Sequence, residues 1–182
     1  MLPVYALAGY SVLVSAAVFV LAWKVGRLAA LVELLERDRL TGCLLRQAGE
    51  RRLPRDGVRG VVVFVDLDGL KAVNDLCGHE AGDRLLALAG MVLRSVTRPG
   101  DIVVRWGGDE FLLFMPGAGS EDVPAITSRL EDALAAAGVR ASAGLVFAAG
   151  EPLEEVVRRA DSAMYEKKRA SAGGREALAQ AV

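Results

Sequence analysis

The sequence predicts an α+β domain with a ferredoxin-like β-α-β-β-α-β core, preceded by one transmembrane helix and a short coiled-coil linker. Residues 2–23 form an uncharged apolar run, and valine and leucine then follow in heptad spacing as far as residue 35. From residue 61 to 168, β-branched runs alternate with amphipathic segments in the order of that core. We therefore expect a transmembrane helix at 2–23, a helical linker at 24–37, a domain at 38–170 and a flexible tail at 171–182.

Composition narrows the possible functions. The 182 residues suffice for one domain of ordinary size and a short appendage. A net charge of −1 provides no basic field, so we expect no nucleic-acid partner. Cys43 and Cys77 are too few for a disulfide framework and are typical of a reducing compartment.

The apolar run at the N-terminus predicts a membrane anchor. Its length, at 1.5 Å rise per residue, matches a hydrocarbon core roughly 30 Å thick. Lys24 and Arg27 follow it, and no basic residue precedes it. The positive-inside rule then predicts a single-pass protein of the inner (cytoplasmic) membrane, with its C-terminal domain in the cytoplasm. Two alternatives stay open: a cleaved signal peptide, although a basic start is missing, and a buried core helix, although these are rarely so long.

A seam of valine and leucine indicates how two chains could associate. The seam consists of Val18, Leu21, Val25, Leu28, Val32 and Leu35. Valine at a with leucine at d favours a parallel two-stranded coiled coil, so we expect a homodimer. The alternative is a single amphipathic helix that packs on its own domain, because the linker holds few heptads.

The domain is expected to place two groups of carboxylates together. Strands are predicted at 61–65, 102–106, 111–115 and 140–147, and helices at 44–53, 70–74, 82–96, 120–137 and 152–168, with a loop at 54–60. In the ferredoxin-like order, the first and third of these strands are antiparallel neighbours. Asp66 should then lie beside Asp109 and Glu110. Carboxylates near a glycine-rich turn are suited to bind Mg²⁺ with a nucleotide.

Two stretches of the domain carry specific motifs. The hairpin reads Arg-Trp-Gly-Gly-Asp-Glu-Phe at 105–111, and the first strand continues as Phe-Val-Asp-Leu-Asp-Gly-Leu-Lys-Ala-Val-Asn-Asp at 64–75. These motifs resemble the GGDEF family of diguanylate cyclases, and the resemblance covers about residues 38 to 168. Further matches, in the family's order, are found at 38–42, 78–83, 141–144 and 160–165. The sequence departs from the pattern at Leu45 and Leu70, where Asn and Phe are usual, and in short loops after Arg46, Met115 and Phe147.

The resemblance implies an enzyme that condenses two GTP molecules into cyclic di-GMP. It implies that Asp66 and the Leu67 carbonyl hold Mg²⁺ or Mn²⁺ together with Asp109 or Glu110. A turn acid is the base, with Glu110 preferred to Asp109, and Lys71 assists at the phosphates. The implied substrate contacts are Asn74 and Asp83 on the guanine edge, His79, the backbone at Gly107 and Gly108, and Lys168 on a phosphate.

Several of these residues also have a purely structural interpretation. His79 can be a local hydrogen-bonding residue in a glycine-rich loop. Asp68 and Asp75 can be turn or helix-cap residues. Asp161 can pair with a neighbouring arginine, and Lys168 is one of three consecutive basic residues.

Arg98 and Asp101 match the family's inhibitory site, at which the product cyclic di-GMP binds away from catalysis. An arginine can stack on guanine and bind a phosphate, and an aspartate can accept hydrogen bonds from the N–H groups on the guanine edge. Arg129 is the expected second contact. The alternative is a simple turn before a strand, because Pro99 and Gly100 lie inside it.

Two other functions remain as alternatives. An inactive receptor that binds cyclic di-GMP would be marked by loss of the turn carboxylates, and Asp109 and Glu110 are both present. A related cyclase of mixed purine specificity is disfavoured by Asp83 at the guanine-reading position.

Overall fold

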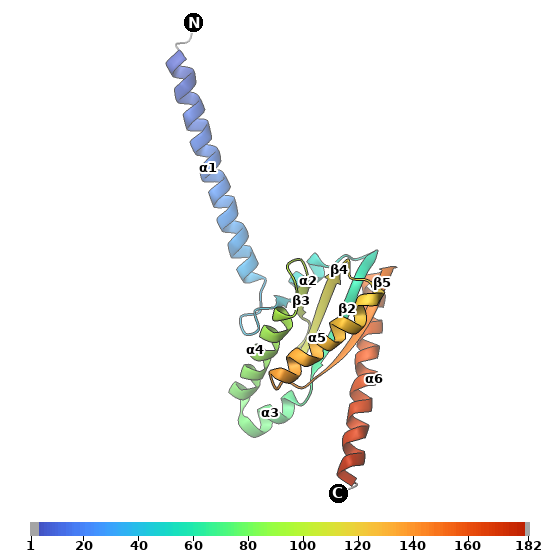
Figure 1. The fold of residues 1–182 in the computed structure, drawn as a ribbon. Helices are drawn as coiled ribbons and strands as arrows, with labels where there is room; N and C mark the ends of the chain where they lie inside the picture. Colours follow the sequence, from blue (N-terminus) through green and yellow to red (C-terminus); the bar gives the residue numbers. More distant parts are fainter. Residues whose placement is uncertain (1–3, 181–182) are drawn as a thin grey trace. The chain divides into compact units, whose positions relative to one another are not determined.

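The structure is a computed structural model that describes the backbone of residues 4–180 and the side chains of residues 14–170. The chain divides into two compact units, Met1–Glu36 and Arg37–Val182. Figure 1 shows the helix of the first unit and the sheet and helices of the second.

The first unit contains a single long helix, α1 (Val4–Leu35). The six seam residues from Val18 to Leu35 lie on it, and each is between 53% and 71% exposed. Among the described residues, no helix combines the length and apolar character needed to cross a membrane. On this finding, the predicted transmembrane helix over 2–23 and the single-pass inner-membrane location are wrong.

Residues 2 and 3 of the predicted transmembrane segment, and the side chains of residues 4–13, lie outside the described part of the chain.

The second unit is built on a five-stranded sheet in the order β1-β3-β4-β2-β5. The strands are β1 (Leu44–Leu45), β2 (Val58–Leu67), β3 (Ile102–Arg105), β4 (Glu110–Pro116) and β5 (Ala141–Glu151). β2 is antiparallel to both β4 and β5, which confirms the predicted pairing of the first and third core strands. Its run of valines is buried on both faces, as expected of a central strand.

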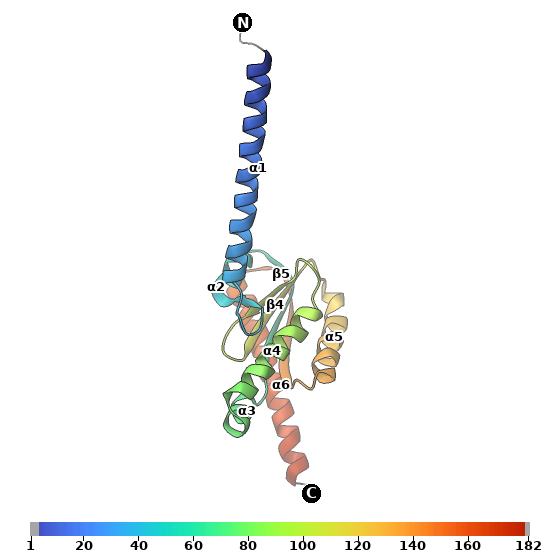
Figure 2. The same cartoon turned by 90° about the vertical axis from the view of Figure 1, so that its left-hand side faces the viewer.

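Helices cover both faces of the sheet. They are α2 (Arg46–Arg52), α3 (Leu70–Cys77), α4 (His79–Ser95), α5 (Val123–Ala136) and α6 (Leu153–Gln180), with a short 3₁₀ helix at Ser120–Asp122. α4 and α5 pack on one face, around Val63, Val65 and Leu113. α2 and α6 pack on the other face, around Val62 and Phe64. Figure 2 shows α4 and α5 on one side of the sheet with α6 on the other.

Close packing of α6 on β5 depends on one glycine. A Cβ on Gly144 would collide with the backbone of α6 at Ala160 and Met164. Because backbone atoms cannot move aside as a side chain can, this helix lies where only glycine fits.

Some helices and strands differ from the predicted ones, mainly where pairing between strands outweighs the local sequence pattern. Leu44 and Leu45, predicted as helix, pair in parallel with Val104 and Arg105 of β3. Part of the predicted loop 54–60 belongs to β2, because Val58 to Gly60 pair with the end of β5. α6 continues to Gln180 through most of the predicted tail, in a stretch rich in alanine, the best helix former.

Candidate functional site

The centre of the site is the sheet edge where β2 ends and β4 begins. Asp66 is the direct cross-strand partner of Glu110. The Leu67 amide donates to the Asp109 carbonyl at 3.1 Å, which holds the turn against the end of β2. The side chains of Asp66, Asp109 and Glu110 are half-buried. The strand order therefore brings together the acidic residues singled out in the sequence.

Electrostatics show that these carboxylates are crowded. Burial raises the pKa of Glu110, and the negative charges of Asp109, Asp66 and Asp161 raise it further. Lys168, from α6, donates a hydrogen bond to Asp66. Burial alone would lower the pKa of Lys168, but the hydrogen bond to Asp66 and the nearby aspartates outweigh it and raise this pKa. The site thus favours a bound cation.

The donors fit a hard divalent cation. In the described part of the chain, no group of three or more His, Cys, Asp or Glu side chains is arranged as a metal site. Mg²⁺, however, is commonly held by one or two carboxylates, with substrate phosphates and water completing its shell. Asp66, Glu110 and the Leu67 carbonyl offer such oxygen donors, and a cation would relieve the repulsion that raises the pKa of Glu110.

Arg105 fixes the glycine turn, and the sequence did not reveal this role. Its guanidinium donates to the Gly108 carbonyl from Nε at 3.2 Å and from Nη2 at 2.7 Å. The remaining nitrogen, Nη1, donates to Asp38 at 3.1 Å. Asp38 also accepts from the Thr41 amide at 2.9 Å and hydroxyl at 2.7 Å. One arginine therefore joins the N-terminal motif at Asp38 to the turn that carries the acidic residues.

The two glycines of the turn are in different surroundings. A Cβ on Gly107 would collide with the Glu110 carboxylate and lie 3.2 Å from its Cδ. A Cβ on Gly108 would meet nothing within 4 Å. The open space at Gly108 leaves its backbone accessible to a ligand, whereas Gly107 makes room for Glu110.

The remaining predicted substrate contacts lie on α3 and α4, the helices that follow β2. Lys71, His79 and Asp83 are exposed, and Asn74 is half-buried. Asp68, by contrast, accepts from the buried Ser142 hydroxyl at 3.1 Å. That bond to β5 favours the structural interpretation of Asp68.

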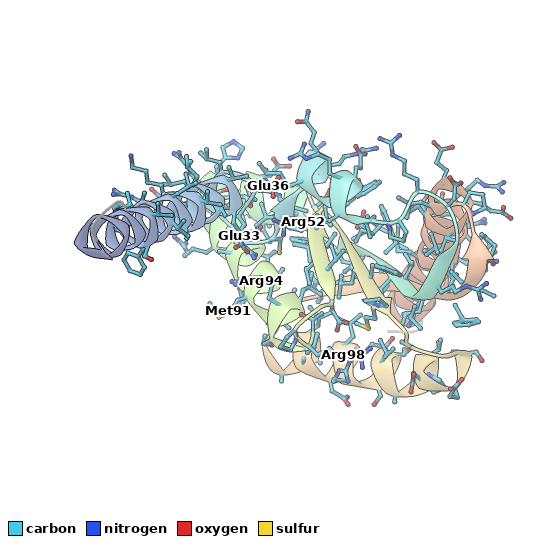
Figure 3. The ribbon with its side chains drawn as sticks, turned by 90° about the horizontal axis from the view of Figure 1, so that it is seen from above. Glu33, Glu36, Arg52, Met91, Arg94 and Arg98 are labelled. Atoms are coloured by element: carbon cyan, nitrogen blue, oxygen red, sulfur yellow. The ribbon has the colours of Figure 1, made fainter. Side chains whose placement is uncertain are left out.

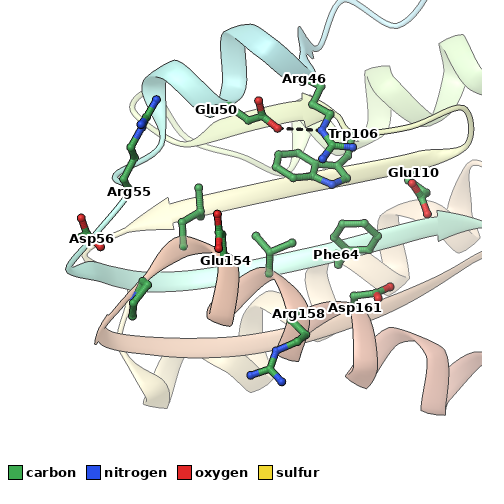
Figure 4. A pocket seen from close by; sticks show the side chains of 13 residues that line it. Arg46, Glu50, Arg55, Asp56, Phe64, Trp106, Glu110, Glu154, Arg158 and Asp161 are labelled. Atoms are coloured by element: carbon green, nitrogen blue, oxygen red, sulfur yellow. Dashed lines mark hydrogen bonds and ion pairs between the residues drawn. The ribbon is translucent and has the colours of Figure 1, made fainter.

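A groove runs from the acidic edge along the sheet between α2 and α6. It has a volume of about 940 Å³ and a floor at Phe64. Arg46 lies over the Trp106 ring, with its guanidinium carbon 4.5 Å from the ring centroid. Figure 4 shows Glu110 and Asp161 at one end of the groove. Asp161 therefore borders the acidic edge of the sheet, where its negative charge acts on Glu110.

The predicted inhibitory motif forms a closed turn between α4 and β3. The Asp101 carboxylate, 2% exposed, accepts from the Arg98 amide at 2.9 Å and from Arg98 Nε at 3.3 Å. Arg98, which is labelled in Figure 3, also donates to the Pro116 carbonyl at 2.9 Å. Arg129 is exposed on α5. A pocket of about 190 Å³ beside Asp101 is also lined by arginines that the sequence did not suggest: Arg37, Arg52 and Arg94.

Comparison with known proteins agrees with this geometry. The family profile described as "Diguanylate cyclase, GGDEF domain" matches residues 31–173. Diguanylate cyclase DgcP of Pseudomonas aeruginosa is 35% identical over 158 residues, which are 78% of this chain but 23% of DgcP. The match thus spans less than a quarter of the length of that relative.

Solved structures show the same fold. Diguanylate cyclase SiaD of Pseudomonas aeruginosa, in complex with its activator SiaC, is 30% identical with a TM-score of 0.70; the match covers 91% of this chain and 71% of that one. The GGDEF domain of DgcB from Caulobacter crescentus, in complex with c-di-GMP, is 25% identical with a TM-score of 0.67; the match covers 74% of this chain and 91% of that one.

Proposed function

Because this chain belongs to the family of GGDEF diguanylate cyclase domains, we propose that it condenses two GTP molecules into cyclic di-GMP and two pyrophosphates. The observation that carries the proposal is the pairing of Asp66 with Glu110 across β2 and β4, beside a turn that keeps both of its acidic residues. A receptor without catalysis has no need of such a crowded acidic edge.

The proposed reaction uses the residues of this edge and of α3 and α4. Glu110, or Asp109 beside it, accepts the proton of the attacking 3′-hydroxyl. Lys71 and Lys168 neutralise the triphosphate, and the open backbone at Gly108 lets it approach. Asn74 and Asp83 accept hydrogen bonds from the guanine edge, and His79 contacts the substrate from the start of α4. Each bond forms as a hydroxyl oxygen attacks the α-phosphate and pyrophosphate leaves.

A divalent cation completes this proposal. Asp66, the Leu67 carbonyl and Glu110 or Asp109 would hold Mg²⁺ or Mn²⁺. When bound, the cation would neutralise charge on the phosphates and help the 3′-hydroxyl to ionise.

The proposed active form is a homodimer, since each domain supplies one GTP and the product has two-fold symmetry. The exposed seam of valine and leucine on α1 supports association through a parallel coiled coil.

Incubation of the full chain with GTP and Mg²⁺, followed by mass spectrometry, tests the proposed function. We expect cyclic di-GMP from GTP and no cyclic product from ATP. Binding of added cyclic di-GMP without any synthesis would replace the proposal with the receptor function. Equal products from GTP and ATP would instead favour a cyclase of mixed purine specificity.

Product inhibition at Arg98 and Asp101 gives a further prediction. In the Arg98→Ala variant, we expect added cyclic di-GMP to inhibit initial rates at least about tenfold less effectively, because a phosphate and stacking contact is removed. The uninhibited rate should remain close to wild type, since the motif lies away from Glu110. Arg129→Ala should weaken inhibition in the same direction. An unchanged inhibition constant in Arg98→Ala would rule out this site.

A further inference from the structure

Gly82 occupies a crowded position between α3 and α4. It is buried in α4. A Cβ built on it would overlap Asn74 Oδ1 and lie 2.9 Å from Asn74 Cγ and 3.3 Å from Asn74 Nδ2. The three atoms nearest to that position therefore all belong to one side-chain amide.

The backbone of Asn74 is fixed independently. Its carbonyl accepts from the Gly78 amide at 2.9 Å, and Gly78 has a φ of 82°, which favours glycine. The Gly78 carbonyl accepts in turn from the Ala81 amide at 3.0 Å. With the corner between the two helices held in this way, the space left at Gly82 determines where the Asn74 amide can lie.

We propose that Gly82 is a positioning residue for guanine recognition, which acts by leaving room for the Asn74 amide beside Asp83. The inference rests on the proposed function, in which Asn74 and Asp83 bind the guanine edge. Asp83 follows Gly82 directly in α4, so the absence of a side chain at Gly82 sets the spacing of the two polar groups. Guanine carries a 2-amino donor that hypoxanthine, the base of ITP, lacks. Two correctly spaced hydrogen-bond acceptors therefore distinguish GTP from ITP.

A methyl group at position 82 should disturb recognition more than folding. The atoms that it would meet are the far end of a side chain, which can rotate away. Alanine is also a better helix former than glycine. Gly82→Ala should therefore fold normally while its Asn74 amide is displaced.

Equilibrium binding of GTP and ITP to the full chain tests the proposal. The variants are Gly82→Ala, Asn74→Ala and the double variant. Gly26→Ala is the matched control, because that helical glycine has nothing within 4 Å of an added Cβ. We expect Gly82→Ala to reduce the preference for GTP over ITP by about tenfold, to the level of Asn74→Ala. The double variant should match Asn74→Ala, and Gly26→Ala should match wild type.

Three outcomes would overturn the proposal. The first is an unchanged preference for GTP over ITP in Gly82→Ala, and the second is a wild-type chain that has no such preference. The third is a double variant that loses as much further preference relative to Asn74→Ala as Gly82→Ala loses relative to wild type. Melting curves followed by circular dichroism confirm that each variant is folded. Because the readout is binding, guanine selectivity without cyclic di-GMP synthesis would contradict the proposed function and leave this inference standing.

Discussion

Replacing Glu110 with glutamine is expected to reduce cyclic di-GMP synthesis on the order of a thousandfold, a loss in the range typical when a general base is removed. Glutamine keeps the shape of the side chain but cannot take a proton from the 3′-hydroxyl, and it is a poorer ligand for a divalent cation. Initial rates at saturating GTP and Mg²⁺ measure the effect. Glu166→Gln, at an exposed position on α6, is the matched control and should retain wild-type activity.

The same variant should be more stable than wild type in metal-free buffer at neutral pH. The folded protein raises the pKa of Glu110 above its ordinary 4.5, first by burial and then by the charges of Asp109, Asp66 and Asp161. Protonated Glu110 therefore contributes to the stability of the folded state in full below pH 4.5. This contribution is lost as pH rises through the pKa of Glu110 in the folded protein. Glutamine cannot ionise and avoids that loss, so the melting temperature of Glu110→Gln should exceed that of the wild type at pH 7. This difference in melting temperature should disappear below pH 4.5. A less stable variant at pH 7 would contradict the crowding of carboxylates.

The strand order accounts for what the sequence could predict of the site. The apolar run before Asp66 and the hairpin around Asp109 and Glu110 are strong local patterns, and the chirality and order of the core then decide which strands pair. Asp66 and Glu110 therefore become neighbours without any knowledge of side-chain contacts. β1 was missed because two residues carry no periodicity, and only their pairing with β3 makes them a strand.

Contacts between side chains far apart in the chain were not predictable. Asp38 and Arg105 are 67 positions apart, and nothing in the local pattern of either shows that they meet. Gly82 belongs to a recognised motif, but its effect on Asn74 depends on how closely α3 and α4 approach. Hydropathy predicts a membrane anchor at the N-terminus, but no helix among the described residues is long and apolar enough to cross a membrane.

The ion pair of Asp38 with Arg105 leads to the second large effect. Asp38→Asn should lower the free energy of unfolding by about 1.5–3 kcal/mol, as expected for hydrogen bonds that involve charged groups. Arg105, which is mostly buried, then loses its carboxylate partner and keeps its hydrogen bonds to the Gly108 carbonyl. Burial alone would raise the pKa of Asp38, but hydrogen bonds from Thr41 and the charge of Arg105 outweigh it and lower this pKa below 3.8. The stabilising contribution is therefore present above pH 3.8 and is lost as pH falls through the folded pKa. Urea unfolding at pH 7 and pH 3 should show a difference from wild type that shrinks at the lower pH.

Arg105→Lys separates the two tasks of this arginine. Lysine can keep the charge opposite Asp38, but a single ammonium cannot also reproduce the two hydrogen bonds to the Gly108 carbonyl. The glycine turn should then lose its fixed position while the ion pair survives. We expect kcat to fall by about a hundredfold, as small misplacements of reacting groups can cause, with a smaller loss of stability than in Asp38→Asn. Wild-type kcat in Arg105→Lys would show that charge alone suffices. A parallel loss of stability and activity in both variants would show that Arg105 holds the domain together and has no separate influence on the geometry of the turn.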